Sequence, residues 1–219
     1  MSDPLVTCLC LTRNRREWLK KAIACFESQT YANRELLIIA DAAPDVECIP
    51  LPENARVFLS GPLNVGRKRN FGCALALGEI IAIWDDDDYS APGRLAYQVA
   101  AMRGPGKQVT GFAHMKVTDG ERWWQYRNKI PGGLVLPTSL CFTKAFWEGH
   151  HFEPIQCGQD EHFITQAVGK KQLASEPDLD LMYFTAHPGN TSPRQLPEKG
   201  SNMWKRLYGF DGSVFQHAQ

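Results

Sequence analysis

Three features that mark specialised classes of protein are missing from this sequence. Neither sign of charge is in excess, because 24 lysines and arginines balance 24 aspartates and glutamates, and this argues against nucleic acid as a partner. No apolar run approaches the roughly 20 residues that a membrane-spanning helix needs. The seven cysteines are odd in number and contain no Cys-x-x-Cys pair, so reduced thiols are expected rather than disulfides or a zinc site.

A secretory leader is not expected either, since the opening Met-Ser-Asp-Pro is short and polar. We therefore expect a cytoplasmic protein, with peripheral association at the inner face of a membrane still compatible with the sequence. The length of 219 residues, with 43% apolar and 22% charged residues, fits one globular domain with a sizeable core.

Short apolar strands alternate with helical patterns over the first hundred residues. Strands are predicted at residues 5–11, 36–40, 56–59 and 80–84, and helices at residues 17–28 and 64–77. This alternation predicts an α/β fold with a mostly parallel central sheet flanked by helices. The polar residues that follow the strands, Thr12, Asp41 and Asp85–Asp88, would then line one crevice at the carboxyl edge of the sheet.

The second half of the chain is less regular. Strands are predicted at 109–118 and 181–185, with helices at 144–147 and from about 160 to 168. We expect a single domain over residues 1–219, whose parts are residues 1–104, residues 105–192 and an amphipathic tail or helix over residues 193–219.

The run Asp85–Asp88 is the most informative stretch. Adjacent carboxylates repel one another unless a cation offsets them, and an extended backbone aims Asp85 and Asp87 to one side. Oxygen ligands of this kind suit Mg²⁺ or Mn²⁺. The alternative is that the acids only favour the N-terminus of a following helix, which Ser90 would cap and Pro92 would begin.

Three further candidates each have a plain structural alternative. The basic start of a helix at residues 67–70 suits a diphosphate, or is a solvated patch. Asp41 suits a base or ribose, or forms a turn. Asp160 suits a general base, or caps a helix.

A histidine and an aromatic group complete the candidates. His187 follows a strand and could be a metal ligand, although a lone histidine is more often a packed or exposed residue. Trp123, Trp124 and Tyr126 could stack on a sugar or pack in the core.

Taken in order, these segments resemble the family 2 glycosyltransferases of the GT-A fold. The likeness is dense over residues 5–100 and sparse over residues 130–192, and the acidic turn is most similar to a bacterial subset. The motifs that carry it are Thr12-Arg-Asn-Arg15, the strand ending on Asp41, Asn64-Val-Gly66, Arg69-Asn70, Ala-Leu-Gly78-Glu-Ile-Ile, the Asp-rich turn, Pro92-x-Arg94-Leu95, Gly158-Gln-Asp160 and His187-x-x-Asn190-Thr-Ser192.

The resemblance implies a donor site for a nucleoside-diphosphate sugar, with UDP favoured. Thr12 and Asp41 would hold the nucleoside, and Arg69 would assist near the donor. Asp85 and Asp86 would contact the ribose or organise the turn. Residues 1–104 would then bind the nucleotide sugar, and residues 105–192 would carry the acceptor site and catalysis.

The resemblance also implies a metal and a base. Asp87 would bind Mn²⁺ or Mg²⁺ at the diphosphate, and His187 lies where some members place a metal ligand. Asp160 would deprotonate a hydroxyl of a glycan, lipid-linked or small-molecule acceptor for a single inverting displacement. Gln159 stands where the family usually has glutamate.

Two other functions stay open at this point. A catalytically inactive nucleotide-binding or scaffold relative is compatible with Gln159. A sugar-nucleotide pyrophosphorylase resembles a different opening, with a Gly-rich loop after the first strand, whereas residues 12–16 contain no glycine. The lack of membrane helices argues against a processive, polymer-exporting synthase.

Overall fold

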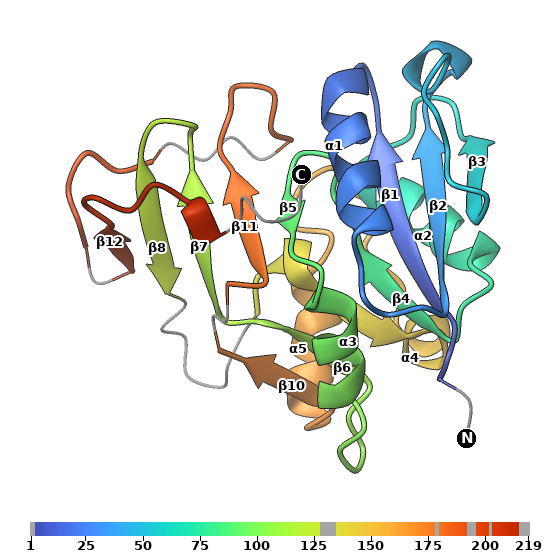
Figure 1. Cartoon of the computed structure of the whole chain (residues 1–219). Coiled ribbons are helices and arrows are strands. Elements are labelled where there is room, and N and C mark those ends of the chain that lie inside the picture. The colour runs from blue at the N-terminus through green and yellow to red at the C-terminus, as the bar shows by residue number, and fades with distance from the viewer. Residues whose placement is uncertain (1–2, 128–134, 178–179, 192–195, 202, 215–219) are drawn as a thin grey trace.

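Two β-sheets that lie side by side organise the structure (Figure 1). It is a computed structural model, and it describes residues 3–127, 135–177, 180–191, 196–201 and 203–214. Ser192 of the last predicted motif lies outside these residues.

The larger sheet has seven strands in the order β10-β6-β9-β4-β1-β2-β3. All of its pairings are parallel except the two that β9 makes, with β4 and with β6. The α/β class and the mostly parallel sheet are therefore confirmed. The strands are β1 (Val6–Thr12), β2 (Arg34–Ala40), β3 (Ala55–Leu59), β4 (Ile80–Ile83), β6 (Val109–Phe112), β9 (Cys141–Thr143) and β10 (Leu173–Glu176).

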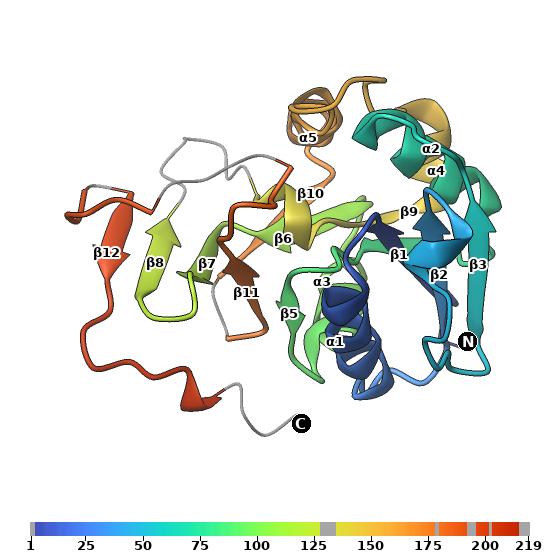
Figure 2. The same cartoon turned by 90° about the horizontal axis from the view of Figure 1, so that it is seen from above.

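Helices cover both faces of this sheet. On one face lie α1 (Arg16–Glu27) and α3 (Arg94–Ala101), and on the other lie α2 (Val65–Leu75), α4 (Lys144–Gly149) and α5 (Glu161–Gly169) (Figure 2). Successive side chains of β1 alternate between these layers, so Cys8 packs on the α1 side and Leu9 on the α2 side. Burial on both faces explains why the strands read as continuous apolar runs in the sequence.

The second sheet has five strands in the order β12-β8-β7-β11-β5 and was not predicted. Its strands are β5 (Tyr89–Ser90), β7 (His114–Thr118), β8 (Trp123–Arg127), β11 (Met182–Thr185) and β12 (Trp204–Arg206). The single strand predicted at residues 109–118 is wrong, because the chain leaves β6 at Ala113 and enters this sheet as β7. The N–H of Ala113 donates to the carbonyl of Glu176 at 3.0 Å, which ends the pairing with β10.

Two other expectations are corrected. Ser90 lies in β5 rather than at a helix N-cap, and α3 begins only at Arg94, whose guanidinium donates to Ser90 Oγ at 2.8 Å. In the tail, Trp204–Arg206 form an edge strand against β8 rather than a helix. The ring of Trp204 packs edge-on against Trp124, so the amphipathic pattern of the tail serves a sheet.

The predicted functional halves are interleaved. β5, from residues 1–104, joins the smaller sheet, whereas β6, β9 and β10, from residues 105–192, join the larger one. The boundaries at 104 and 192 stay predictions.

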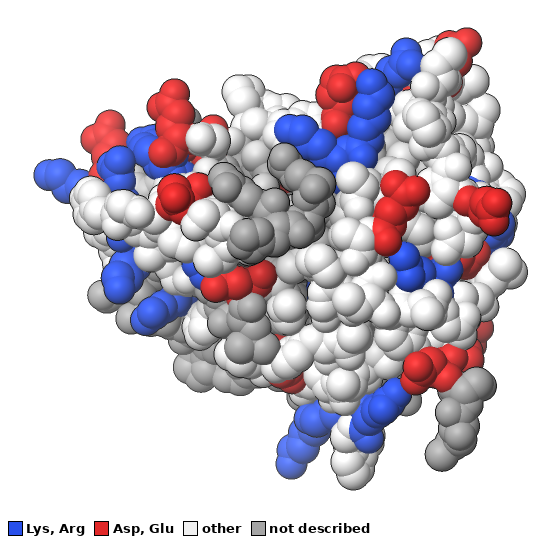
Figure 3. Space-filling view, viewed as in Figure 1, with Lys and Arg blue, Asp and Glu red and all other residues white. Residues whose placement is uncertain are grey.

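The surface matches the balanced composition. Acidic and basic side chains are interspersed across the face shown in Figure 3 rather than gathered by sign. Within the described ranges, no helix has both the length and the apolar character to cross a membrane.

Candidate active site

A cavity of about 310 Å³ opens where the two sheets meet, at the carboxyl end of β4. This volume is at the lower end of the range typical of small-molecule sites. Its polar wall includes Arg15, Arg69, Asp85–Asp87, Gln156, Gln159, Asp160, Glu161 and Asn190, and its apolar wall includes Met115, Val117, Tyr126, Leu136 and Phe184. The larger sheet therefore supplies much of the charge, and the smaller sheet supplies much of the apolar surface.

In the acidic turn after β4, Asp86, Asp87 and Asp88 are buried and Asp85 is partly exposed. Asp86 accepts hydrogen bonds from the hydroxyl of Thr12 at 2.8 Å and from the guanidinium of Arg15 at 2.9 Å. Burial and the neighbouring charge of Asp87 raise the pKa of Asp86 to about 7 despite Arg15. Burial also raises the pKa of Asp85, although the charge of Arg69 opposes this. The turn is therefore short of positive charge and favours a cation.

A helix dipole does not explain these acids. The next helix, α3, begins at Arg94, well beyond the turn, and β5 lies between them. Asp88 has a separate, structural place, because the hydroxyl of Thr138 and the backbone N–H of Thr185 both donate to it. It fastens the turn to the short 3-10 helix at Pro137–Ser139 and to β11.

Asp87 in the acidic turn contacts His187 in the loop after β11. Nε2 of His187 lies 3.0 Å from Oδ2 of Asp87, and the side-chain amide of Asn190 donates to the same oxygen at 3.1 Å. The backbone N–H of Gly189 donates to Nδ1 of His187 at 3.1 Å, so the neutral ring carries its proton on Nε2 and donates to Asp87. The ring stacks on Trp18 of α1, with centroids 4.9 Å apart.

This pair fits a divalent cation. Two atoms that bind Mg²⁺ in adjacent positions, each at about 2.0–2.1 Å, lie about 3 Å apart, which matches the separation of Nε2 and Oδ2. No group of three or more histidine, cysteine or acidic residues is arranged to hold a metal in the described part of the chain. A metal here would therefore complete its shell with ligand oxygens and water.

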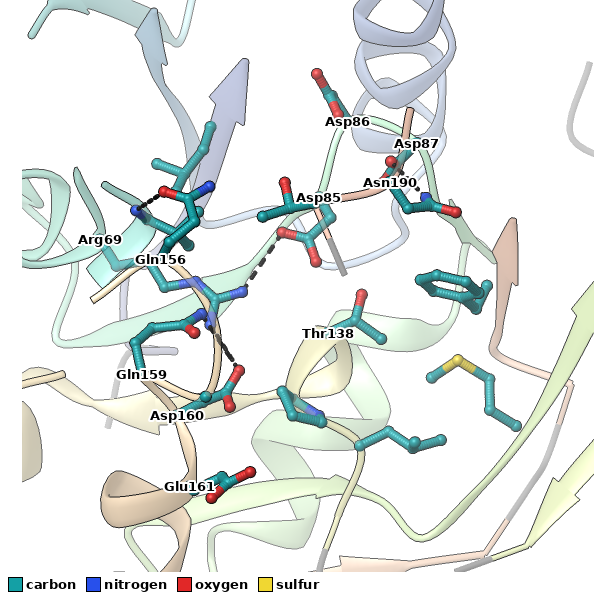
Figure 4. A pocket seen from close by; sticks show the side chains of 18 of the residues that line it. Arg69, Asp85, Asp86, Asp87, Thr138, Gln156, Gln159, Asp160, Glu161 and Asn190 are labelled. Carbon is teal, nitrogen blue, oxygen red and sulfur yellow. Dashed lines mark hydrogen bonds and ion pairs between the residues drawn. The ribbon is translucent and has the colours of Figure 1, made fainter. Parts of the chain in front are cut away.

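Arg69 joins the acidic turn to Asp160 (Figure 4). Its Nη1 lies 3.2 Å from Oδ2 of Asp160, and its Nη2 lies 3.7 Å from Oδ1 of Asp85. The amide of Gln159 also donates to Asp160, at 3.3 Å. Asp160 precedes α5 directly, but its side chain makes no capping hydrogen bond to any residue that the structure describes. Helix capping, the alternative for Asp160, is therefore not supported.

The Asn64-Val-Gly66 motif holds the loop that carries Asp160. The side chain of Asn64 donates to the carbonyl of Pro154 at 2.7 Å, and the N–H of Gly66 donates to that of Ile155 at 3.0 Å. A Cβ on Gly66 would lie 1.7 Å from the carbonyl oxygen of Glu153. Only glycine allows this close approach of α2 to the loop.

Asp41 lies at the end of β2, beside the end of β1 that carries Thr12. It follows β2 directly and pairs with the buried ammonium of Lys68 and, at 3.4 Å, with the guanidinium of Arg13. Its turn-forming alternative is weakened, because it is Asp45 that accepts the backbone N–H groups of Asn14 and Ala42. Asp41 is not among the described residues that line the cavity.

The basic segment at residues 67–70 was predicted to bind a diphosphate or to be solvated, and the aromatic residues 123, 124 and 126 to stack on a sugar or to pack in the core. Lys68 and Arg69 are buried and paired with acids, so they are not a solvated patch. Trp124 is fully buried and belongs to the core, and Trp123 packs against Tyr183. Tyr126 alone of the three predicted aromatic residues lines the cavity.

Three contact residues were missed as site residues. Arg15 and Asn190 stand in the quoted motifs without a role, and Trp18 lies in the helix predicted at residues 17–28. The position of Arg15 just after β1, among polar residues, was a signal, because strand ends gather at one edge. Nothing local indicated that Trp18 would stack on His187.

The model of a family described as glycosyl transferase family 2 matches residues 8–161. The chain belongs to glycosyl transferase family 2. The match includes the acidic turn and Asp160 but ends before His187.

Two curated relatives of this family 2 member are bacterial. The putative glycosyltransferase EpsH of Bacillus subtilis (strain 168) is 31% identical over 98 residues, covering 42% of this chain and 28% of the relative. The putative colanic acid biosynthesis glycosyl transferase WcaA of Escherichia coli (strain K12) is 28% identical over 155 residues, covering 67% and 54%. The chain thus spans about half, or less, of the length of these relatives.

Solved structures share the fold at low identity. TarS 1-349 of S. aureus in complex with UDP-GlcNAc has a TM-score of 0.67 and 16% identity, with 87% of this chain and 61% of that chain covered. The mannosyltransferase PcManGT from Pyrobaculum calidifontis, in complex with GDP-Man and Mn²⁺, has a TM-score of 0.64 and 14% identity, with 87% and 59% covered. The GT-A fold is thereby confirmed.

Proposed function

We propose that this family 2 member is an inverting glycosyltransferase that moves a sugar from a nucleoside-diphosphate donor, with UDP favoured, to an acceptor hydroxyl. The observation that carries the proposal is the convergence of the acidic turn, Arg69 and Asp160 on one cavity. A relative of the same fold binds UDP-GlcNAc, and another binds GDP-Man and Mn²⁺, which supports a nucleotide-sugar donor.

The donor would lie along the strand ends. Thr12 and Asp41 would hold the nucleoside, since β1 and β2 are neighbours and Thr12 pairs with Ala40 directly before Asp41. Asp85 and Asp86 would contact the ribose or organise the turn. Arg69 would face the diphosphate, because its guanidinium is buried at the cavity wall and its Nε has no partner among the described residues.

Asp87 and His187 would hold the Mn²⁺ or Mg²⁺ ion. When bound, that ion would stabilise the charge that develops on the leaving diphosphate. The donor set of one carboxylate and one imidazole suits Mn²⁺, with diphosphate oxygens and water as its other ligands.

Asp160 would act as the general base. Its carboxylate takes the proton of the acceptor hydroxyl, whose oxygen forms a bond to the anomeric carbon from the face opposite the diphosphate. The bond from that carbon to the diphosphate oxygen breaks, and the nucleoside diphosphate leaves with the electron pair. An α-linked donor would give a β-linked product on a glycan, a glycolipid or a small molecule.

A catalytically inactive nucleotide-binding relative is the second candidate. Arg69 and Gln159 both donate to Oδ2 of Asp160, so that oxygen of the proposed base already has two hydrogen-bond donors. This observation keeps the second candidate in place until turnover is measured.

Release of nucleoside diphosphate from UDP-, GDP- and dTDP-sugars separates the two functions. We expect the wild-type protein to release the nucleoside diphosphate from at least one donor, and Asp160→Asn to bind that donor without turnover. Glu148→Gln, an exposed acid on α4, is the matched control and should keep wild-type turnover. Donor binding without release, equal in the wild type and in Asp160→Asn, would favour the inactive relative.

A further inference from the structure

We propose that the guanidinium of Arg15 neutralises the acidic turn in the metal-free protein. There it competes with the divalent ion for Asp87, and it is released toward the donor diphosphate. The inference rests on the metal site of the proposed function. It assigns a positioning role to a residue that the family motif contains but whose partners only the structure identifies.

Arg15 spans two of the loops at the cavity. Its Nη1 donates to Oδ1 of Asp86 at 2.9 Å and to Oδ2 of Asp87 at 2.7 Å, and its Nη2 donates to the carbonyl of Gly189. The side chain is 21% exposed, so solvent screens these contacts only in part. An arginine side chain is not deprotonated in proteins. The guanidinium therefore stays charged and offsets two carboxylates.

Oδ2 of Asp87 leaves little room for a further ligand. It accepts hydrogen bonds from three described donors, on Arg15, His187 and Asn190. A carboxylate offers about four lone-pair sites over both of its oxygens, so a metal at Oδ2 must displace a donor. Arg15 is the donor most opposed to a metal, because two cations on one oxygen repel each other.

The contact of Arg15 with Gly189 stabilises His187, the second proposed metal ligand, in the form that does not bind a metal. Ligation through Nε2 of His187 requires that the ring proton leave Nε2 for Nδ1. Nδ1 now accepts the N–H of Gly189, so that N–H must turn away. Gly189 packs closely on the ring, since a Cβ there would lie 3.2 Å from Nδ1, and Arg15 binds its carbonyl. Release of Arg15 would therefore free both metal ligands.

The cavity offers Arg15 a new partner. Arg15 lines the same cavity as Arg69, where the proposed donor brings a diphosphate. A guanidinium fork pairs well with phosphate oxygens. The metal would take the place of Arg15 on Asp87, and Arg15 would contact the diphosphate. Arg15 should thus weaken metal binding to the free protein but strengthen binding of the nucleotide.

The opposite effects expected of Arg15 on metal binding and on nucleotide binding are tested by two measurements. Mn²⁺ binding to the whole chain without nucleotide is measured by electron paramagnetic resonance of the free ion, and UDP binding with saturating Mn²⁺ is measured by calorimetry. We expect Arg15→Gln to bind Mn²⁺ about tenfold more tightly and UDP about tenfold more weakly, the size of one lost charge-assisted hydrogen bond. Arg16→Gln removes the same charge at an exposed neighbour and should change neither value.

Arg15→Lys keeps the charge without the fork and should bind Mn²⁺ with intermediate affinity, which guards against a folding defect in Arg15→Gln. Mn²⁺ binding to Arg15→Gln no tighter than to the wild type would overturn the competition. Unchanged UDP binding in that variant would overturn the release toward diphosphate. UDP binding by the wild type with no Mn²⁺ binding to either protein would overturn this inference, while nucleotide-sugar transfer would stand.

Discussion

His187 lies with Nε2 3.0 Å from Oδ2 of Asp87, although 100 positions separate the two residues in the chain. The contact joins the loop after β11, from the smaller sheet, to the turn after β4, from the larger one. One carboxylate and one imidazole at this separation can share a proton or a divalent ion.

Trp18 should act through His187. Its ring stacks on the imidazole at an interplanar angle of 16°, so Trp18→Leu removes the surface that orients the ring. We expect Mn²⁺ affinity to fall about tenfold, the size typical of lost support around a metal ligand, with the fold retained. Calorimetry with Mn²⁺ and UDP measures the change. Tyr208→Leu, at an exposed aromatic residue, is the control, and an equal loss in both variants would refute the specific role of Trp18.

Gly66→Ala should displace the loop that carries Asp160. The new Cβ would meet the carbonyl oxygen of Glu153 at 1.7 Å, so the loop must shift. A shift of about 1 Å in a reacting group costs on the order of 100-fold in rate. Release of nucleoside diphosphate should fall by this factor. The control Gly149→Ala should have no effect, because an added Cβ there has nothing within 4 Å. Wild-type turnover in Gly66→Ala would show that the close approach does not position Asp160.

Glu35 should give the stability of the larger sheet a defined pH dependence. Although burial opposes it, hydrogen bonds from Arg56, Thr7 and the N–H of Leu77 lower the pKa of Glu35 from 4.5. A lowered pKa means that the stabilisation is fully present above pH 4.5 and is lost as the pH falls through the lower folded value. Stability should therefore decline below about pH 4.5 in the wild type.

The variant Glu35→Gln isolates this effect. We expect it to lower the free energy of unfolding by about 1–3 kcal/mol at pH 7, with a smaller difference at acid pH, as measured by urea unfolding. The exposed Glu79→Gln should change stability by less than about 0.5 kcal/mol. A difference between Glu35→Gln and the wild type that stays constant with pH would contradict the assignment.

The sequence was sufficient for β1, β2, β3 and β4 of the larger sheet, but it did not predict β9, β10 or the smaller sheet. Buried parallel strands such as β1 and β2 give continuous apolar runs, so their positions and the carboxylates at their ends were predictable. β5 has two residues and β12 has three, and such short strands leave no periodic signal. Their existence depends on pairing with β11 and β8, which are distant in the chain.

The same distinction holds within the site. The acidic turn carried its own signal, because four adjacent carboxylates are costly without a cation. Asp160 and His187 had no such signal, and their roles came from the resemblance to family 2. The contacts of Arg15 with Asp86 and Gly189 depend on how three separate loops meet, which no local pattern records.

Calorimetry of UDP binding tests the central claim most directly, with Mn²⁺ present and again with a chelator. The account predicts binding in Mn²⁺ that is lost with the chelator and in Asp87→Asn, while Glu148→Gln, at an exposed acid on α4, binds as the wild type does. GDP, dTDP and CMP replace UDP if UDP gives no heat. The absence of binding by all four nucleotides would contradict a nucleotide-sugar site in this cavity.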